Sequence, residues 1–205
     1  MAAWKRGVPT VCPCAPTSNA GAWEMMSIRW PAAAAVFPAT PCTFLFRGSS
    51  ASASQYLESA ALLHEIGLFI SHDQHHRHSY YLIRNAELYG YSENEKEIIA
   101  LVARYHRKSH PKLKHEGFGT LSPETQHLIS VLSGILRIAD GLDRTHSSLI
   151  RSIKVSKKGK IILFRLGARK KSADIDLELW GAKRKSTLFE EQFKSPVHFT
   201  VAAKR

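Results

Sequence analysis

The sequence predicts a mainly helical fold with a small α/β unit at its carboxyl end. Apolar residues recur at helical spacing over residues 54–150. Residues 151–205 change to the shorter period of strands, around one further helical stretch. Residues 1–53 keep neither period past their prolines, so we expect disorder there. We therefore divide the chain into these three parts.

The first part differs from the rest in composition. Residues 1–53 hold all three methionines, three of the four tryptophans, six of the nine prolines and all three cysteines. No continuous apolar core follows Lys5 and Arg6, as a secretory signal would require, and the segment lacks the serine content of a clear transit peptide. We favour a misplaced start or a frameshifted translation joined to a genuine domain.

The first two of four predicted helices rest on capping and stop signals. Ser54 caps the first helix, and Gly67 ends it. The second helix runs from about His75 to Leu88 and stops before Gly90. Its core candidates are Tyr81, Leu82, Ile83 and Ala86.

The third and fourth helices carry stronger start signals. Ser92 with Glu95 forms a capping box for the third helix, which ends near Ser109 before a proline. Ser122 caps the fourth helix, which continues to Asp143. The apolar face of the third helix consists of Ile98, Ile99, Leu101, Val102 and Tyr105.

The carboxyl-terminal unit is predicted as strand, strand, helix, strand. The strands cover residues 153–155, 161–164 and 197–201, and the helix covers 174–193. The helical residues available for burial are Leu177, Trp180, Leu188 and Phe189.

Charge and composition restrict the partners. The 205-residue chain has a formal net charge of +12, which indicates polyanionic partners such as nucleic acid, polyphosphate, nucleotides or an acidic protein surface. A merely basic, solvated surface is the equally weighted alternative. The basic runs at 169–171 and 183–185 are interpreted as solvated surface. No stretch approaches the roughly 20 apolar residues of a membrane span. The body without cysteine fits a reducing compartment, so a cytoplasmic location is expected.

Histidine, carboxylate and arginine residues recur within the apolar helices. They are His64-Glu65, His75-His76-Arg77-His78, Arg104-Tyr105-His106-Arg107, and Arg137, Asp140, Asp143 and Arg144. Buried charges need partners, and Asp140 would repel Glu65 unless a cation lay between them. A divalent metal, an arginine or a shared proton would each serve. Core-packed histidines and ion pairs along a solvated helix face are the alternatives.

The order of these motifs resembles a known family. The segments 62–67, 75–83, 103–109 and 136–144 resemble the carboxyl-terminal half of the Ppx/GppA family of exopolyphosphatases and guanosine pentaphosphate phosphohydrolases. The resemblance covers residues 54–205. It implies an HD-like helical domain, similar to metal phosphohydrolases, followed by a small α/β domain.

Two departures from the family pattern affect the expected chemistry. No counterpart of the actin-like half, which carries the phosphatase site in that family, precedes residue 54. The His-Asp pair of HD domains reads His64-Glu65, and residues 1–53 hold no histidine to supply a further ligand. The resemblance therefore leaves His64, Glu65 and Asp140 as ligands for a divalent metal, Mn, Fe or Mg.

The expected function is that of an accessory phosphatase half that binds polyphosphate or guanosine polyphosphate and shows little hydrolysis alone. The phosphate-binding residues are expected to be His75, His76, His78, Arg104, His106, Arg107 and Arg144, and no catalytic residue is assigned. An HD-type metal-dependent phosphohydrolase is the first alternative, and a basic nucleic-acid-binding module is the second. If missing first helices leave part of the core uncovered, either a homodimer or poor solubility would follow.

Overall fold

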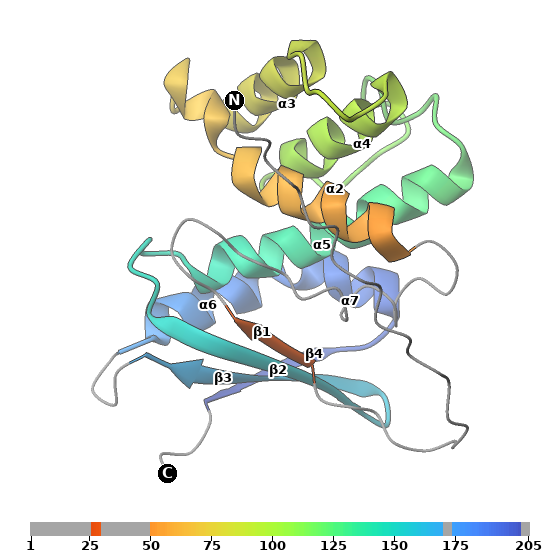
Figure 1. The fold of residues 1–205 in the computed structure, drawn as a ribbon. Helices are drawn as coiled ribbons and strands as arrows, with labels where there is room; N and C mark the ends of the chain where they lie inside the picture. Colours follow the sequence, from red (N-terminus) through yellow and green to blue (C-terminus); the bar gives the residue numbers. More distant parts are fainter. Residues whose placement is uncertain (1–25, 30–49, 170–173, 202–205) are drawn as a thin grey trace, which may run out of the picture.

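The computed structural model describes residues 26–29, 50–169 and 174–201 and contains three layers (Figure 1). A four-stranded sheet forms one outer layer, and three helices pack across one face of it: α5 (Pro123–Leu142), α6 (Asp176–Lys185) and α7 (Thr187–Phe193). Three further helices pack on the other side of α5: α2 (Ser50–Leu63), α3 (His75–Asn85) and α4 (Glu93–Arg104). The mainly helical fold with a small α/β unit is confirmed.

The helical part matches the sequence in its element types and shifts some of their ends. The helix α2 spans Ser50–Leu63, so it begins four residues before the predicted cap. It is followed by the short helix η1, Ile66–Phe69, and by α3, His75–Asn85, which ends before Leu88. Of the predicted core residues of α3, Ile83 is buried, but Tyr81 is 63% exposed and that expectation is wrong.

The two helices with strong start signals are confirmed. The helix α4, Glu93–Arg104, begins with the capping box of Ser92 and Glu95, and its predicted apolar face is buried. It ends before Ser109. The helix α5, Pro123–Leu142, begins after Ser122, whose side chain accepts from the Thr125 amide.

The sheet has the order β1-β2-β3-β4. The strands β2, Ile150–Lys158, and β3, Ile161–Ala168, form an antiparallel hairpin that is longer than predicted. The strand β4, Val197–Val201, returns parallel to β3 after α6 and α7. The strand β1, Met26–Arg29, pairs antiparallel with β2, so the expected disorder does not hold there; residues 1–25 and 30–49 lie outside the described residues.

The predicted helix over 174–193 is two helices. They are α6, Asp176–Lys185, and α7, Thr187–Phe193, separated at Ser186. Leu188 and Phe189 are buried as expected, whereas Leu177 and Trp180 are more than half exposed. The sequence suggested burial from apolar residue type, but the inward face of α6 carries Gly181 and Ala182 instead.

The helix α5 belongs to two hydrophobic cores. Its residues Ile129, Leu132 and Leu136 pack with α2, α3 and α4. Its last turns pack with the sheet and with α6 and α7 through Ile138 and Leu142. One helix is thus shared by both cores. The domain boundary expected near residue 150 stays a prediction. In the described part of the chain, no helix is long and apolar enough to cross a membrane.

Candidate functional site

A hollow lies where the helical part meets the α/β unit. It has a volume of about 540 Å³. Its walls come from the loops after α2 and α4, the start of α3, the end of α5, and α6. Its charged side chains are Glu65, Asp140, Arg107, Lys108, Arg137, Arg144, Arg184 and Lys185, and its histidines are His72, His75, His106 and His146. Six cationic side chains therefore face two carboxylates.

Local packing fixes the first residues of this cavity. Gly67 is buried, and a Cβ atom there would lie 2.1 Å from the carbonyl oxygen of His75, so only glycine allows α3 to come this close. The buried Ser79 hydroxyl accepts from the Gly67 amide at 2.9 Å and donates to the His64 carbonyl at 2.7 Å. These contacts hold the end of α2 against α3.

The three predicted metal ligands come together. One ligand atom from each of His64, Glu65 and Asp140 lies within 4.8 Å of the other two. The Nδ1 atom of His64 is 2.8 Å from the Ala61 carbonyl oxygen, which can only accept, so Nδ1 carries the proton and Nε2 is free to ligate. One imidazole nitrogen and two carboxylates suit a divalent cation.

Asp140 already has a cation beside it. Its Oδ2 atom accepts from Lys185 Nζ in an ion pair, and only 12% of the Asp140 side chain and 19% of the Lys185 side chain are exposed. Burial alone would raise the Asp140 pKa, but Lys185, His106 and His64 outweigh it and lower the pKa below its ordinary value. Asp140 is therefore a largely buried carboxylate anion.

Arg137 does not pair with Asp140, as an ion pair along the helix would require. It is buried, and its guanidinium donates to the carbonyl oxygens of Tyr105 at 2.9 Å and Lys108 at 3.1 Å. Burial lowers its pKa, and Nε has no partner among the described residues. This cation fixes the loop after α4 at the cavity wall.

A hydrogen-bonded chain runs from the cavity into the core. The Nδ1 atom of His106 lies 2.7 Å from the Ala103 carbonyl oxygen, so this nitrogen donates and Nε2 accepts. The Nε2 atom of His75 lies 3.3 Å from it, while His75 Nδ1 is 3.2 Å from the His72 carbonyl oxygen. The Arg107 guanidinium lies 3.2 and 3.3 Å from the two ring nitrogens of His75. Burial lowers the His106 pKa to about 3, which keeps this imidazole neutral near pH 7.

Of the seven predicted phosphate-binding residues, four line the cavity and three do not. The four are His75, His106, Arg107 and Arg144. Arg104 lies over the Tyr80 ring, 5.0 Å from its centre, and donates to the Glu116 carbonyl. His76 and His78 do not line the cavity either; burial lowers the His76 pKa to about 4.

Sequence reasoning missed several residues of this cavity. They are His72, Lys108, His146, Trp180, Arg184 and Lys185, together with Leu68 and Gly181. Lys185 and Arg184 belong to the basic run that was interpreted as solvated surface. No periodic signal in α6 could have found them, because their position depends on how α6 packs against α5.

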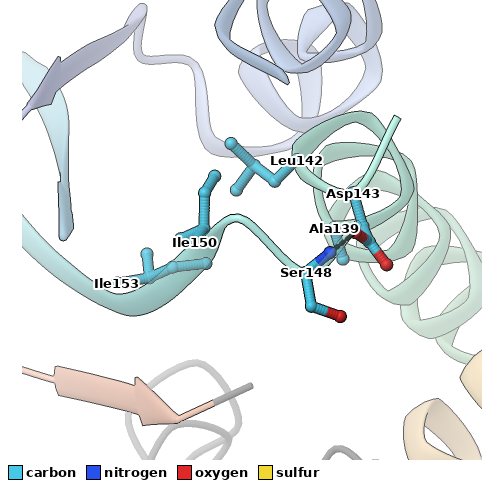
Figure 2. A pocket seen from close by; sticks show the side chains of 6 residues that line it. All are labelled: Ala139, Leu142, Asp143, Ser148, Ile150 and Ile153. Atoms are coloured by element: carbon cyan, nitrogen blue, oxygen red, sulfur yellow. Dashed lines mark hydrogen bonds between the residues drawn. The ribbon is translucent and has the colours of Figure 1, made fainter. Parts of the chain in front are cut away.

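A smaller hollow lies where α5 meets β2 (Figure 2). Its volume of about 10 Å³ is no more than one water molecule needs. Asp143 at its edge accepts from the Ser148 amide at 3.0 Å, which shapes the turn into β2. Asp143 therefore stabilises the turn between α5 and β2, and the small hollow is too small for a ligand.

Comparisons with known proteins agree on one family. The family described as Ppx/GppA phosphatase, domain III, matches residues 37–180. A guanosine-5'-triphosphate,3'-diphosphate pyrophosphatase of Pseudoalteromonas translucida (strain TAC 125) is 38% identical over 76 residues, which is 37% of this chain and 15% of that protein. The protein of that name from Pseudoalteromonas atlantica (strain T6c / ATCC BAA-1087) is 31% identical over 83 residues, 40% of this chain and 16% of its own length. The matches thus span about one sixth of these relatives.

Proposed function

Because the chain belongs to the Ppx/GppA phosphatase family through its domain III, we propose that it binds a polyphosphorylated anion in the cavity beside α3 and α6. The ligand class is polyphosphate or a guanosine polyphosphate. The relatives are named for a guanosine polyphosphate, which supports this class. The role is that of an accessory part of a phosphatase, with little hydrolysis by this chain alone.

The excess of cations in the cavity carries this proposal. Six arginine and lysine side chains against two carboxylates leave a positive field in a recess, where water screens charges less than on an open surface. The planar guanidinium of Arg107 stands beside His75, and arginine forks match phosphate oxygens. The volume of about 540 Å³ lies within the usual range of small-ligand sites.

Paired charge removals test this proposal. We expect Arg107→Met with Arg144→Met to weaken binding of inorganic triphosphate at least tenfold, which is about 1.4 kcal/mol. The matched control is Arg77→Met with Lys112→Met, which removes the same charge from exposed positions outside the cavity. Isothermal titration calorimetry would give both affinities, and far-UV circular dichroism would check the fold.

Equal losses in the two double variants would contradict the proposal, because they would show attraction to the overall charge. RNA added as a competitor separates the nucleic-acid alternative. If substituting Arg107 and Arg144 leaves the binding of RNA unchanged, RNA binds elsewhere on the surface.

The metal-dependent phosphohydrolase remains a second candidate, because one observation favours it. His64, Glu65 and Asp140 would hold a divalent cation, which would supply Lewis-acid assistance to phosphate hydrolysis. Phosphate release by the purified chain that is lost in Asp140→Ala, together with loss of bound metal, would support this candidate and overturn the accessory role. Unchanged metal content in Asp140→Ala would refute it.

A further inference from the structure

The carboxylate of Asp140 can bind a divalent metal ion or the ammonium group of Lys185, but it cannot bind both closely at once. It is one of three groups whose ligand atoms lie within 4.8 Å of one another, with His64 and Glu65. It also forms the ion pair with Lys185. Both side chains of that ion pair are largely buried, so bulk water solvates neither charge fully.

The three ligand atoms are spaced almost closely enough for a metal. With each pair no more than 4.8 Å apart, some point lies within 4.8 Å divided by √3, about 2.8 Å, of all three. Ligand distances of bound divalent ions are about 2.0–2.6 Å. Small inward shifts of the side chains would therefore complete the set.

The ammonium group of Lys185 is positioned by the packing of two helices. A Cβ atom at Gly141 of α5 would lie 2.7 Å from the Cα atom of Ala182 in α6, so these backbones touch. This contact brings the last turn of α6, where Lys185 lies, to Asp140. The α/β unit thus supplies a cation to a carboxylate that the helical part carries, Asp140.

A lysine ammonium and a divalent ion compete for one carboxylate. Two cations on Asp140 would repel each other in a partly buried site, where charges interact more strongly than in water. The flexible stem of lysine allows the ammonium to swing away when another cation arrives. Metal affinity at this site therefore includes the cost of displacing Lys185.

We propose that Lys185 is a built-in cation that holds Asp140 in place of a divalent metal, and that removing its charge uncovers a metal site made by His64, Glu65 and Asp140. This inference is independent of anion binding in the cavity, because it concerns metal affinity measured without any phosphate. Lys185 would thereby lower the affinity of the site for a divalent metal ion.

The test is a titration with Co²⁺ in phosphate-free buffer, followed by its visible absorption and by calorimetry. We expect Lys185→Met to bind Co²⁺ at least tenfold more tightly than the unsubstituted chain. Lys183→Met, which removes the same charge from an exposed position of α6, should leave the affinity unchanged. Asp140→Asn added to Lys185→Met should abolish the gain.

A second variant protects the test against misfolding. Lys185→Met leaves the Asp140 carboxylate without a donor, whereas the amide of Lys185→Gln can still donate a hydrogen bond to it. Both variants should show the gain, with unchanged circular dichroism in at least the glutamine variant. Co²⁺ affinity of a folded Lys185→Gln variant equal to that of the unsubstituted chain, or a gain that survives Asp140→Asn, would overturn the proposal.

Discussion

At the scale of single residues, the site consists of ordinary side chains held in unusual surroundings. The imidazoles of His64 and His106 each have a backbone carbonyl within hydrogen-bond distance of Nδ1, three residues earlier in the chain. This fixes both tautomers. Nε2 of His64 faces Glu65 and Asp140 as a candidate ligand, whereas Nε2 of His106 lies 3.3 Å from Nε2 of His75. His76 differs, because its buried Nδ1 has no partner among the described residues.

We predict that His76 makes the protein less stable in mild acid. Burial, with nearby Arg107 and His75, lowers its pKa to about 4, so the folded state stays neutral while the unfolded chain takes up a proton near pH 6.5. The free energy of unfolding therefore decreases as the pH falls from 6.5 towards 4, by at most about 1.4 kcal/mol per pH unit. His76→Phe should flatten this dependence in urea unfolding measured between pH 7 and pH 5.

The control for this prediction is His127→Gln, on the exposed face of α5. It should leave the pH dependence as it is. If His76→Phe loses as much stability as the unsubstituted chain between pH 7 and pH 5, the titration of His76 does not contribute.

At the scale of elements, the contact between α5 and α6 decides the geometry of the cavity. Gly141 and Gly181 let the two helix backbones touch. The carboxyl-terminal end of α5 then presents Asp140, and the last turn of α6 presents Lys185. A wider spacing between these helices would separate the pair.

We expect Gly141→Ala to destabilise the fold by about 1–3 kcal/mol, because its Cβ atom would meet backbone atoms of α6 that cannot rotate away. The measurement is the free energy of unfolding in urea. His127→Ala, at an exposed position of the same helix, should change this free energy by less than about 0.5 kcal/mol. A Gly141→Ala variant as stable as the unsubstituted chain would show that the helices can separate at little cost.

At the scale of the whole molecule, one helix joins the two cores. Ile135 of α5 packs against both of them. Separating the helical part from the α/β unit would expose Ile138 and Leu142, which are buried against the sheet and its helices. The two parts are therefore expected to depend on each other for stability.

We predict a single cooperative unfolding transition for both parts. Far-UV circular dichroism should report the helices, and a fluorophore attached at an exposed position such as Lys157 on β2 should report the sheet. Their urea midpoints should coincide. Two separated midpoints would show that the parts fold independently, as the predicted boundary near residue 150 implies.

The sequence by itself determined the element types and their strongest boundaries. The capping box at Ser92, the cap at Ser122 and the apolar face of α4 are local signals, and the structure confirms them. The motif order also indicated the family. The position of His64, Glu65 and Asp140 near one another could be expected from the resemblance, although binding of a metal by them stays a proposal.

Only the tertiary structure decided which charges meet. Arg137 and Asp140 are three residues apart on α5, yet each finds its partner elsewhere, in carbonyl groups of the loop after α4 and in Lys185 of α6. Local spacing records which residues share a helix face. It does not record the distance between α5 and α6, which the glycines at their contact set. That distance brings Arg184 and Lys185, two residues of a basic run predicted as solvated surface, to the wall of the cavity.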